Sequence, residues 1–122
     1  MLRPRRHLIL VTLSVLLVTP ACGLRHHTVK TRTGTLMVTP ATGKVQMPFA
    51  LTASGFRPGE AMTFEIDVPG KAPFIGPSHT ADPQGTVSTT YVPLTGDPAG
   101  VYKILAVGNQ GTRAEGSVMV TG

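Results

Sequence analysis

The one cysteine of the chain, Cys22, follows an apolar segment at a position where its thiol could be modified covalently. Residues 1–7 include three arginines, and residues 8–18 are an uncharged apolar run that ends close to the cysteine. A short basic segment, an apolar run and small residues at its end are typical of an export signal. The run is also shorter than the roughly 20 residues that a membrane-spanning helix needs. We therefore expect a signal peptide at residues 1–21.

The four histidines could supply a metal site or a general base, but their spacing favours neither. His26 and His27 are adjacent, so their side chains point apart in an extended chain, and a closed metal site needs further ligands. His79 is the one histidine of the predicted domain, and no catalytic motif pairs it with a Ser, Cys or carboxylate. We expect no metal and no cofactor.

Acidic residues cluster around one predicted strand, where Glu60, Glu65 and Asp67 could form an acidic patch. Calcium requires six or more oxygen ligands from a shaped loop, whereas the alternation of Glu65 and Asp67 predicts a solvated strand face. The sequence also lacks a nucleophile elbow, a His-Glu-x-x-His motif and a phosphate-binding loop. We therefore expect no catalytic residues and no enzyme activity.

A possible binding contact lies in residues 72–81, where Phe74 and Ile75 occur among glycine and prolines and His79 follows. Two large apolar side chains in a broken segment are candidates for an exposed contact. The alternative is a loop that caps the core, since most apolar loop residues pack inward.

The length of 122 residues favours one domain, and a single cysteine excludes an internal disulfide. From Cys22 onward, eight Lys or Arg face six Asp or Glu, so the formal charge is +2. This balance gives no electrostatic indication of nucleic-acid binding.

Residues 22–34 are rich in cations and poor in apolar side chains, which predicts a polar tether. From Thr35 the pattern changes to short runs with alternating apolar residues, which predict strands. These runs are 35–39, 48–53, 61–68, 86–92, 101–107 and 113–121, with 72–81 as a broken edge strand or crossing loop. We therefore expect an all-β domain at 35–122, a two-sheet sandwich of six or seven antiparallel strands, preceded by a signal helix and the tether.

The sequence around Cys22 resembles a bacterial lipoprotein signal, with Ala21 before and Gly23 after the cysteine that becomes the new N-terminus. Thr19 and Pro20 stand where such signals usually have Leu and a small residue. The resemblance implies a diacylglycerol on Cys22, with acyl chains such as palmitate, and two chains anchor a protein stably to a membrane. Plain secretion and an uncleaved membrane anchor are the alternatives.

Three phrases of the domain resemble bacterial extracytoplasmic immunoglobulin-like domains: G-F-x-P-G-E at 55–60, A-D-x-x-G-x-V at 81–87 and A-G-x-Y at 99–102. This resemblance implies an immunoglobulin-like sandwich outside the cytoplasm and says little about function. Neocarzinostatin-like chromoproteins share similar strand phrases, although their two disulfides cannot form here. Tyr102 is also placed to make a tyrosine corner, in which the phenol bonds a nearby backbone group.

Together these expectations favour a lipid-anchored, non-catalytic module on the outer face of the cytoplasmic membrane that contacts an unidentified envelope protein. An exposed strand edge could serve this contact by β-augmentation. The alternative is a small-ligand carrier with a cleft at the sandwich end. A deep apolar cleft bordered by Phe74, Ile75 and His79 would favour the carrier, and a filled sandwich with a long bare edge would favour protein contact.

Overall fold

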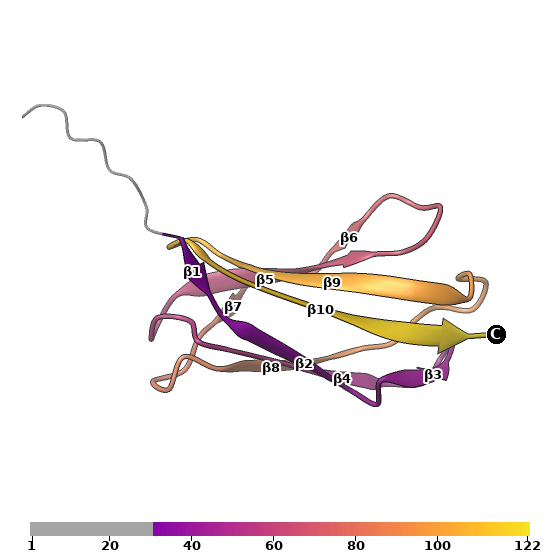
Figure 1. Cartoon of the computed structure of the whole chain (residues 1–122), viewed down its shortest axis with the longest axis horizontal. Helices are drawn as coiled ribbons and strands as arrows, with labels where there is room; N and C mark the ends of the chain where they lie inside the picture. Colours follow the sequence, from indigo (N-terminus) through magenta and orange to yellow (C-terminus); the bar gives the residue numbers. More distant parts are fainter. Residues whose placement is uncertain (1–30) are drawn as a thin grey trace, which may run out of the picture.

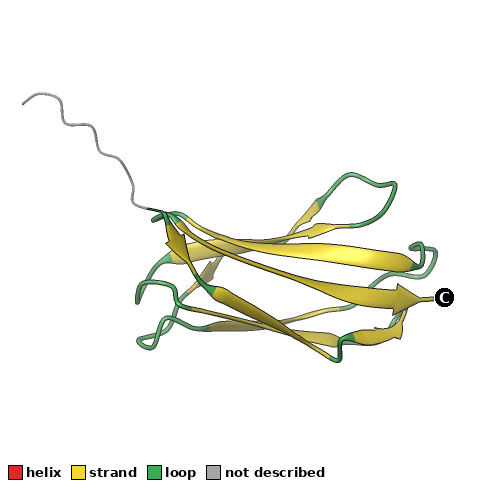
Figure 2. Cartoon of the chain, in the orientation of Figure 1, coloured by secondary structure: helices red, strands yellow, loops and turns green. Residues whose placement is uncertain are grey.

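The computed structural model describes residues 31–122, which form strands and turns (Figure 1). The strands are β1 (Arg32–Thr33), β2 (Thr35–Thr39), β3 (Thr42–Lys44), β4 (Phe49–Ser54), β5 (Ala61–Asp67), β6 (Phe74–Ile75), β7 (His79–Thr80), β8 (Val87–Tyr91), β9 (Gly100–Gly108) and β10 (Thr112–Thr121). Strands and loops make up all of this part (Figure 2), which confirms the all-β class. No helix among these residues is long and apolar enough to cross a membrane. The predicted signal peptide, Cys22 and most of the predicted tether lie outside the described residues.

The strands form two sheets that pack face to face. The larger sheet has the order β1-β10-β9-β5-β6, with β3 also beside β10 and β7 beside β5. The smaller sheet has the order β2-β4-β8. The two sheets form separate layers in Figure 1, which confirms the predicted sandwich.

The first three strands pass from one sheet to the other and close one side of the sandwich. β1 pairs with β10, β2 pairs with β4 in the smaller sheet, and β3 returns to β10. Both pairings with β10 are parallel. The longer strands pair antiparallel as predicted, but the prediction of antiparallel strands did not include β1 and β3. Segments of two and three residues are too short to show the alternation on which that prediction depended.

The fold begins earlier than the sequence predicts, because Arg32 and Thr33 belong to the sheet and not to the tether. The Arg32 amide donates to the Gly111 carbonyl at 3.0 Å, and the Gly34 amide donates to the Arg113 carbonyl at 2.8 Å. These are backbone interactions, so the polar composition of this segment does not prevent them.

Alternation along the strands places apolar side chains in the interior as expected. The alternation in the sequence predicts ten inward-facing side chains. Nine of them are buried, and the tenth, Tyr91, is partly buried against them. The buried nine are Phe49, Leu51, Phe64, Ile66, Val87, Tyr102, Ile104, Val118 and Val120. Each such side chain contributes about 1.5–3 kcal/mol to stability when it is fully buried.

A buried carboxylate, Glu60, joins two turns at the end of the sandwich where β1 begins. Its Oε1 accepts hydrogen bonds from the Arg57 amide at 2.9 Å and from the Thr112 hydroxyl at 2.8 Å. Its Oε2 accepts from the Gln110 amide at 2.9 Å and the Thr112 amide at 3.4 Å. Burial of a charge is tolerated when hydrogen bonds replace its water, and here four donors do so.

The same carboxylate requires a glycine beside it. A Cβ atom added to Gly108 would lie 2.1 Å from Glu60 Oε2, which is well inside van der Waals contact. The backbone of Glu60 is also held, because the Ala81 amide donates to its carbonyl at 2.9 Å. Glu60 therefore fixes the β4–β5 loop against the β9–β10 turn and the residue that follows β7.

Replacing Glu60 by Gln is expected to lower the free energy of unfolding at pH 7 by about 2–3 kcal/mol, because an amide nitrogen cannot accept the hydrogen bonds and leaves buried donors unpaired. Urea unfolding followed by circular dichroism measures this loss. Glu65→Gln makes the same chemical change on a partly exposed strand position, and we expect it to change stability by less than about 0.5 kcal/mol. Equal losses in the two variants would contradict the assigned role of Glu60.

The pH dependence of stability gives a second readout in the same experiment. Burial acts to raise the pKa of Glu60, but the hydrogen bonds from Arg57, Thr112 and Gln110 outweigh it and hold the pKa below its ordinary value of 4.5. A lowered folded-state pKa contributes stability that is fully present above pH 4.5. This stability is lost as the pH falls through the folded-state pKa. Glu60→Gln should therefore be less sensitive to acid over this range than the unmodified chain.

Candidate functional site

The sandwich is closed on one side and open on the other. β2 packs against β10 on the closed side. On the open side, a cleft of about 580 Å³ lies between β8 of the smaller sheet and the segment of the larger sheet that contains β6 and β7. The cleft gives access to part of the hydrophobic interior.

The floor and walls of this cleft are mainly apolar and aromatic. Core side chains line its floor, namely Leu51, Phe64, Ile66 and Val68. Phe74 from β6 reaches across to Tyr91 from β8, with ring centroids 6.1 Å apart. The His79 ring meets Phe64 edge-on, with centroids 5.8 Å apart. Such contacts favour an apolar or aromatic occupant over a charged one.

Large apolar side chains remain exposed at the mouth of the cleft. Phe74 is 50% exposed and Leu94 is 70% exposed, and Val92 lies beside them along the same mouth. Neighbouring exposed apolar side chains are a feature of interaction surfaces.

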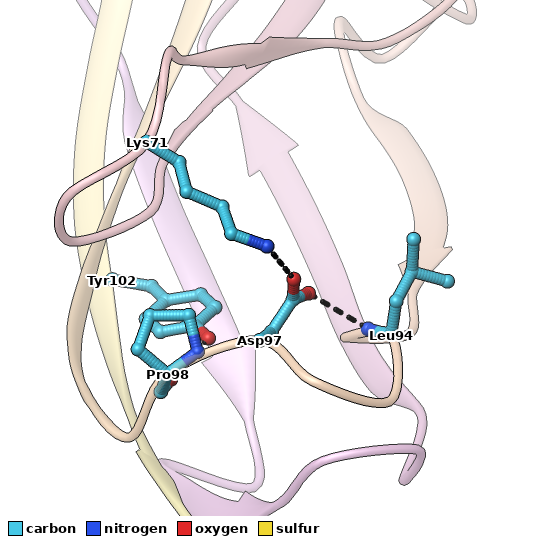
Figure 3. A network of polar contacts seen from close by, with 5 residues as sticks. All are labelled: Lys71, Leu94, Asp97, Pro98 and Tyr102. Atoms are coloured by element: carbon cyan, nitrogen blue, oxygen red, sulfur yellow. Dashed lines mark hydrogen bonds and ion pairs between the residues drawn. The ribbon is translucent and has the colours of Figure 1, made fainter.

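An ion pair marks one end of the cleft (Figure 3). Lys71 Nζ lies 2.9 Å from Asp97 Oδ1, and the other carboxylate oxygen accepts a hydrogen bond from the Leu94 amide at 2.8 Å. The hydrogen bond from Lys71, together with that from Leu94, holds the pKa of Asp97 below its ordinary value. The pair links the β5–β6 loop to the β8–β9 loop.

The predicted tyrosine corner is confirmed beside this ion pair. The Tyr102 hydroxyl donates a hydrogen bond to the Pro98 carbonyl, four residues earlier (Figure 3). Tyr102 is fully buried, and its ring lies 6.5 Å from that of Tyr91. Tyr102 therefore packs behind Tyr91 in the cleft wall and holds the β8–β9 loop in place.

Tyr91 brings a polar group to the cleft wall. Its hydroxyl makes no hydrogen bond with another group within residues 31–122, so it is available to an occupant. Burial first, and then the negative charge of Asp97, raise the pKa of Tyr91 to about 12. At neutral pH the phenol is protonated and can donate a hydrogen bond.

The structure places the residues predicted as a binding contact in different positions. Phe74 and His79 line the cleft, whereas Ile75, 61% exposed, is not among its lining residues. Phe74 and Ile75 are exposed, whereas a loop that caps the core would bury them. β6 and β7 are also very short, as expected for a broken edge strand.

The three acidic residues do not form one patch, and Glu65 and Asp67 lie on a solvated strand face as their alternation predicts. Glu60 is buried in the network described above, while Glu65 and Asp67 lie on the outer face of β5. Within residues 31–122, no three His, Cys, Asp or Glu side chains are arranged to hold a metal ion.

Sequence reasoning missed the Lys71–Asp97 pair and the role of Tyr91. The pair joins two loops 26 residues apart, and nothing in the local sequence indicates that they meet. The position of Tyr91 on an alternating strand correctly predicted that it faces inward. Alternation alone could not show that the opposite sheet leaves this part of the interior uncovered.

Comparisons with known proteins agree with this fold. A family model described as a macroglobulin-like domain matches residues 31–118. The superoxide reductase (neelaredoxin) of Ignicoccus hospitalis is similar in structure, with 18% identity over 73% of this chain and 80% of its own and a TM-score of 0.55. Macromomycin is 18% identical over 72% of this chain and 99% of its own, with a TM-score of 0.53.

An alkylpurine DNA glycosylase of Pseudomonas fluorescens is 14% identical over 75% of this chain and 30% of its own, with a TM-score of 0.55. At these identities the three likenesses show a shared fold and nothing about activity. The comparison with curated proteins found no relative.

The environment of Tyr91 predicts an unusual alkaline titration. The chain has two tyrosines and no tryptophan, so tyrosinate absorbance in the near ultraviolet reports on Tyr91 and Tyr102 alone. In the folded chain we expect Tyr91 to ionise near pH 12, whereas in urea both tyrosines should ionise near pH 10.0. Tyr91→Phe should remove the transition near pH 12. A folded-state transition near pH 10 that Tyr91→Phe abolishes would contradict this environment.

Proposed function

The chain belongs to the macroglobulin-like domain family, and on that premise we propose that it is an exported, non-catalytic binding module that contacts a protein partner through its apolar cleft. Lipid on Cys22 would hold the module at the outer face of the cytoplasmic membrane. The cleft on the open side of the sandwich carries the proposal of a binding module. A cleft bordered by Phe74 and His79 would by itself favour the carrier, but the exposed apolar side chains around it and the edge strand β8 beside it favour a protein partner.

The distribution of exposed apolar side chains supports a contact surface. The predicted tether leads into β1, at the end of the sandwich where β1 pairs with β10. Five exposed apolar side chains lie at the opposite end, namely Met47, Val92, Leu94, Val101 and Met119. Phe74 and Ile75 lie on the open side. A tether attached at one end would therefore present the apolar end and the cleft away from the membrane.

A small-ligand carrier is the second candidate, and the size of the cleft favours it. Small-molecule pockets commonly measure about 300–1,000 Å³ and combine apolar walls with a few polar groups. The cleft, at about 580 Å³, fits this description through the Tyr91 hydroxyl and His79. Its partner would be an apolar molecule with one hydrogen-bond acceptor.

Photo-crosslinking tests the binding surface and separates the two candidates. A photoreactive residue in place of Leu94 is expected to give a discrete adduct in cells that produce the protein natively. A gain of several kilodaltons identifies a protein partner, and a gain of a few hundred daltons identifies a small ligand. The same residue in place of Met37, which is 62% exposed on β2, is the control and should give neither. Equal labelling at both positions would refute the cleft as the binding surface.

The membrane anchor is tested by intact mass and by one substitution. Protein extracted from membranes should lack residues 1–21 and carry a diacylglycerol adduct on Cys22. Cys22→Ser should move the protein out of the membrane fraction, because two acyl chains provide most of the membrane affinity of such an anchor. A membrane-bound protein with an unmodified Cys22 would exclude the lipid anchor.

A further inference from the structure

β8 is an edge strand without the features that usually prevent an edge from pairing. Among residues 31–122 its one strand partner is β4, whereas β2, at the other edge of the same sheet, packs against β10. Edge strands are commonly protected by charged residues, prolines or bulges. β8 has the sequence Val-Ser-Thr-Thr-Tyr and pairs with β4 residue by residue without a bulge. Its outer backbone groups are therefore free to bond another strand.

The free edge of β8 borders the cleft along the C-terminal part of the strand and the residue that follows it. Thr89, Thr90, Tyr91 and Val92 all line the cleft. A strand added to β8 would lie across the opening, and alternate side chains of that strand would point to the apolar floor. One peptide would then both pair its backbone with β8 and bury its side chains in the cleft.

Apart from Phe74, which reaches across to Tyr91, the opposite wall consists of short strands and a Gly-Pro pair. β6 and β7 have two residues each, and Gly76 and Pro77 line the cleft between them. The Gly76 amide donates to the Phe64 carbonyl at 3.0 Å, which holds this backbone close to β5. Since glycine has no side chain, nothing projects from the backbone into the cleft at Gly76.

The charges around the cleft indicate an uncharged occupant. Residues 31–122 contain six Lys or Arg and six Asp or Glu, and residues 86–96 contain none of either. The charged residues that line the cleft, Lys71 and Asp97, pair with each other. A charged group placed over the apolar floor would lose water without gaining a partner.

We propose that the cleft receives an extended, uncharged peptide segment of the partner protein, which adds to the sheet at β8 and places alternate apolar side chains over Phe64 and Ile66. This inference rests on the proposed function of the cleft and adds the chemical class of its occupant. The free backbone of β8 favours a peptide over a small apolar molecule, which would leave these groups unpaired.

Selection from a random nine-residue peptide library, with the full-length protein as the target, tests the inference. We expect the selected peptides to alternate apolar and polar residues and to lack charge and proline in their centre. Phe74→Lys should weaken their binding about tenfold or more, because it places a charge at the cleft. Ile75→Lys is the matched control, because Ile75 is adjacent and similarly exposed but does not line the cleft, and its effect should be below about twofold.

Backbone methylation of the best peptide separates strand pairing from side-chain burial. In an added strand, alternate amides point to β8, so single N-methyl groups should weaken binding about tenfold at every second residue and much less at the residues between them. Hydrogen exchange of β8 amides should slow when the unmethylated peptide binds.

Three results would overturn the inference. One is that no selected peptide is weakened by Phe74→Lys, and another is that N-methylation has no period of two. The third is that the protein dimerises with its β8 amides already protected, which would identify a second copy of the chain as the occupant. Because photo-crosslinking at Leu94 reports any occupant, it can succeed when the peptide inference fails, so the two failures are distinguishable.

Discussion

The requirement to satisfy a buried carboxylate organises one end of this domain. Glu60 is fully buried, and an anion in that position is stable only with hydrogen bonds that replace its water. The β4–β5 loop and the β9–β10 turn supply these donors, so both segments must keep one geometry. Gly108 leaves space for the carboxylate, and the Gly111 carbonyl in the same turn receives the first amide of β1. The entry of the chain into the sandwich therefore depends on Glu60.

The course of the chain after β1 decides which side of the sandwich is open. β1, β2 and β3 use both sheets in turn and close the side along β10. The opposite side has no comparable strand within residues 31–122, because the segment that could close it is broken into β6 and β7. The cleft is a consequence of this asymmetry, and so is the unpaired edge of β8.

Membership of the macroglobulin-like domain family fits a non-catalytic module, and in this chain the sandwich holds the loops that border the cleft. The Tyr102–Pro98 hydrogen bond and the Lys71–Asp97 pair fix the loops around the cleft (Figure 3), while the side chains at its mouth remain exposed. Fixed loops reduce the conformational entropy that a partner would have to remove on binding. The cleft is therefore suited to select its occupant by shape and neutrality.

The sequence by itself determined the all-β class, the longer strands, the inward-facing set and the tyrosine corner. These features depend on residues two to five positions apart, and alternation and turn residues report on that range. Only the tertiary structure decided that Glu60 is a buried carboxylate that joins two loops, that β1 and β3 pair in parallel with β10, and that Tyr91 borders a cleft. Each of these depends on which distant segments meet, and an inward-facing side chain has the same sequence period whether or not the opposite sheet covers it.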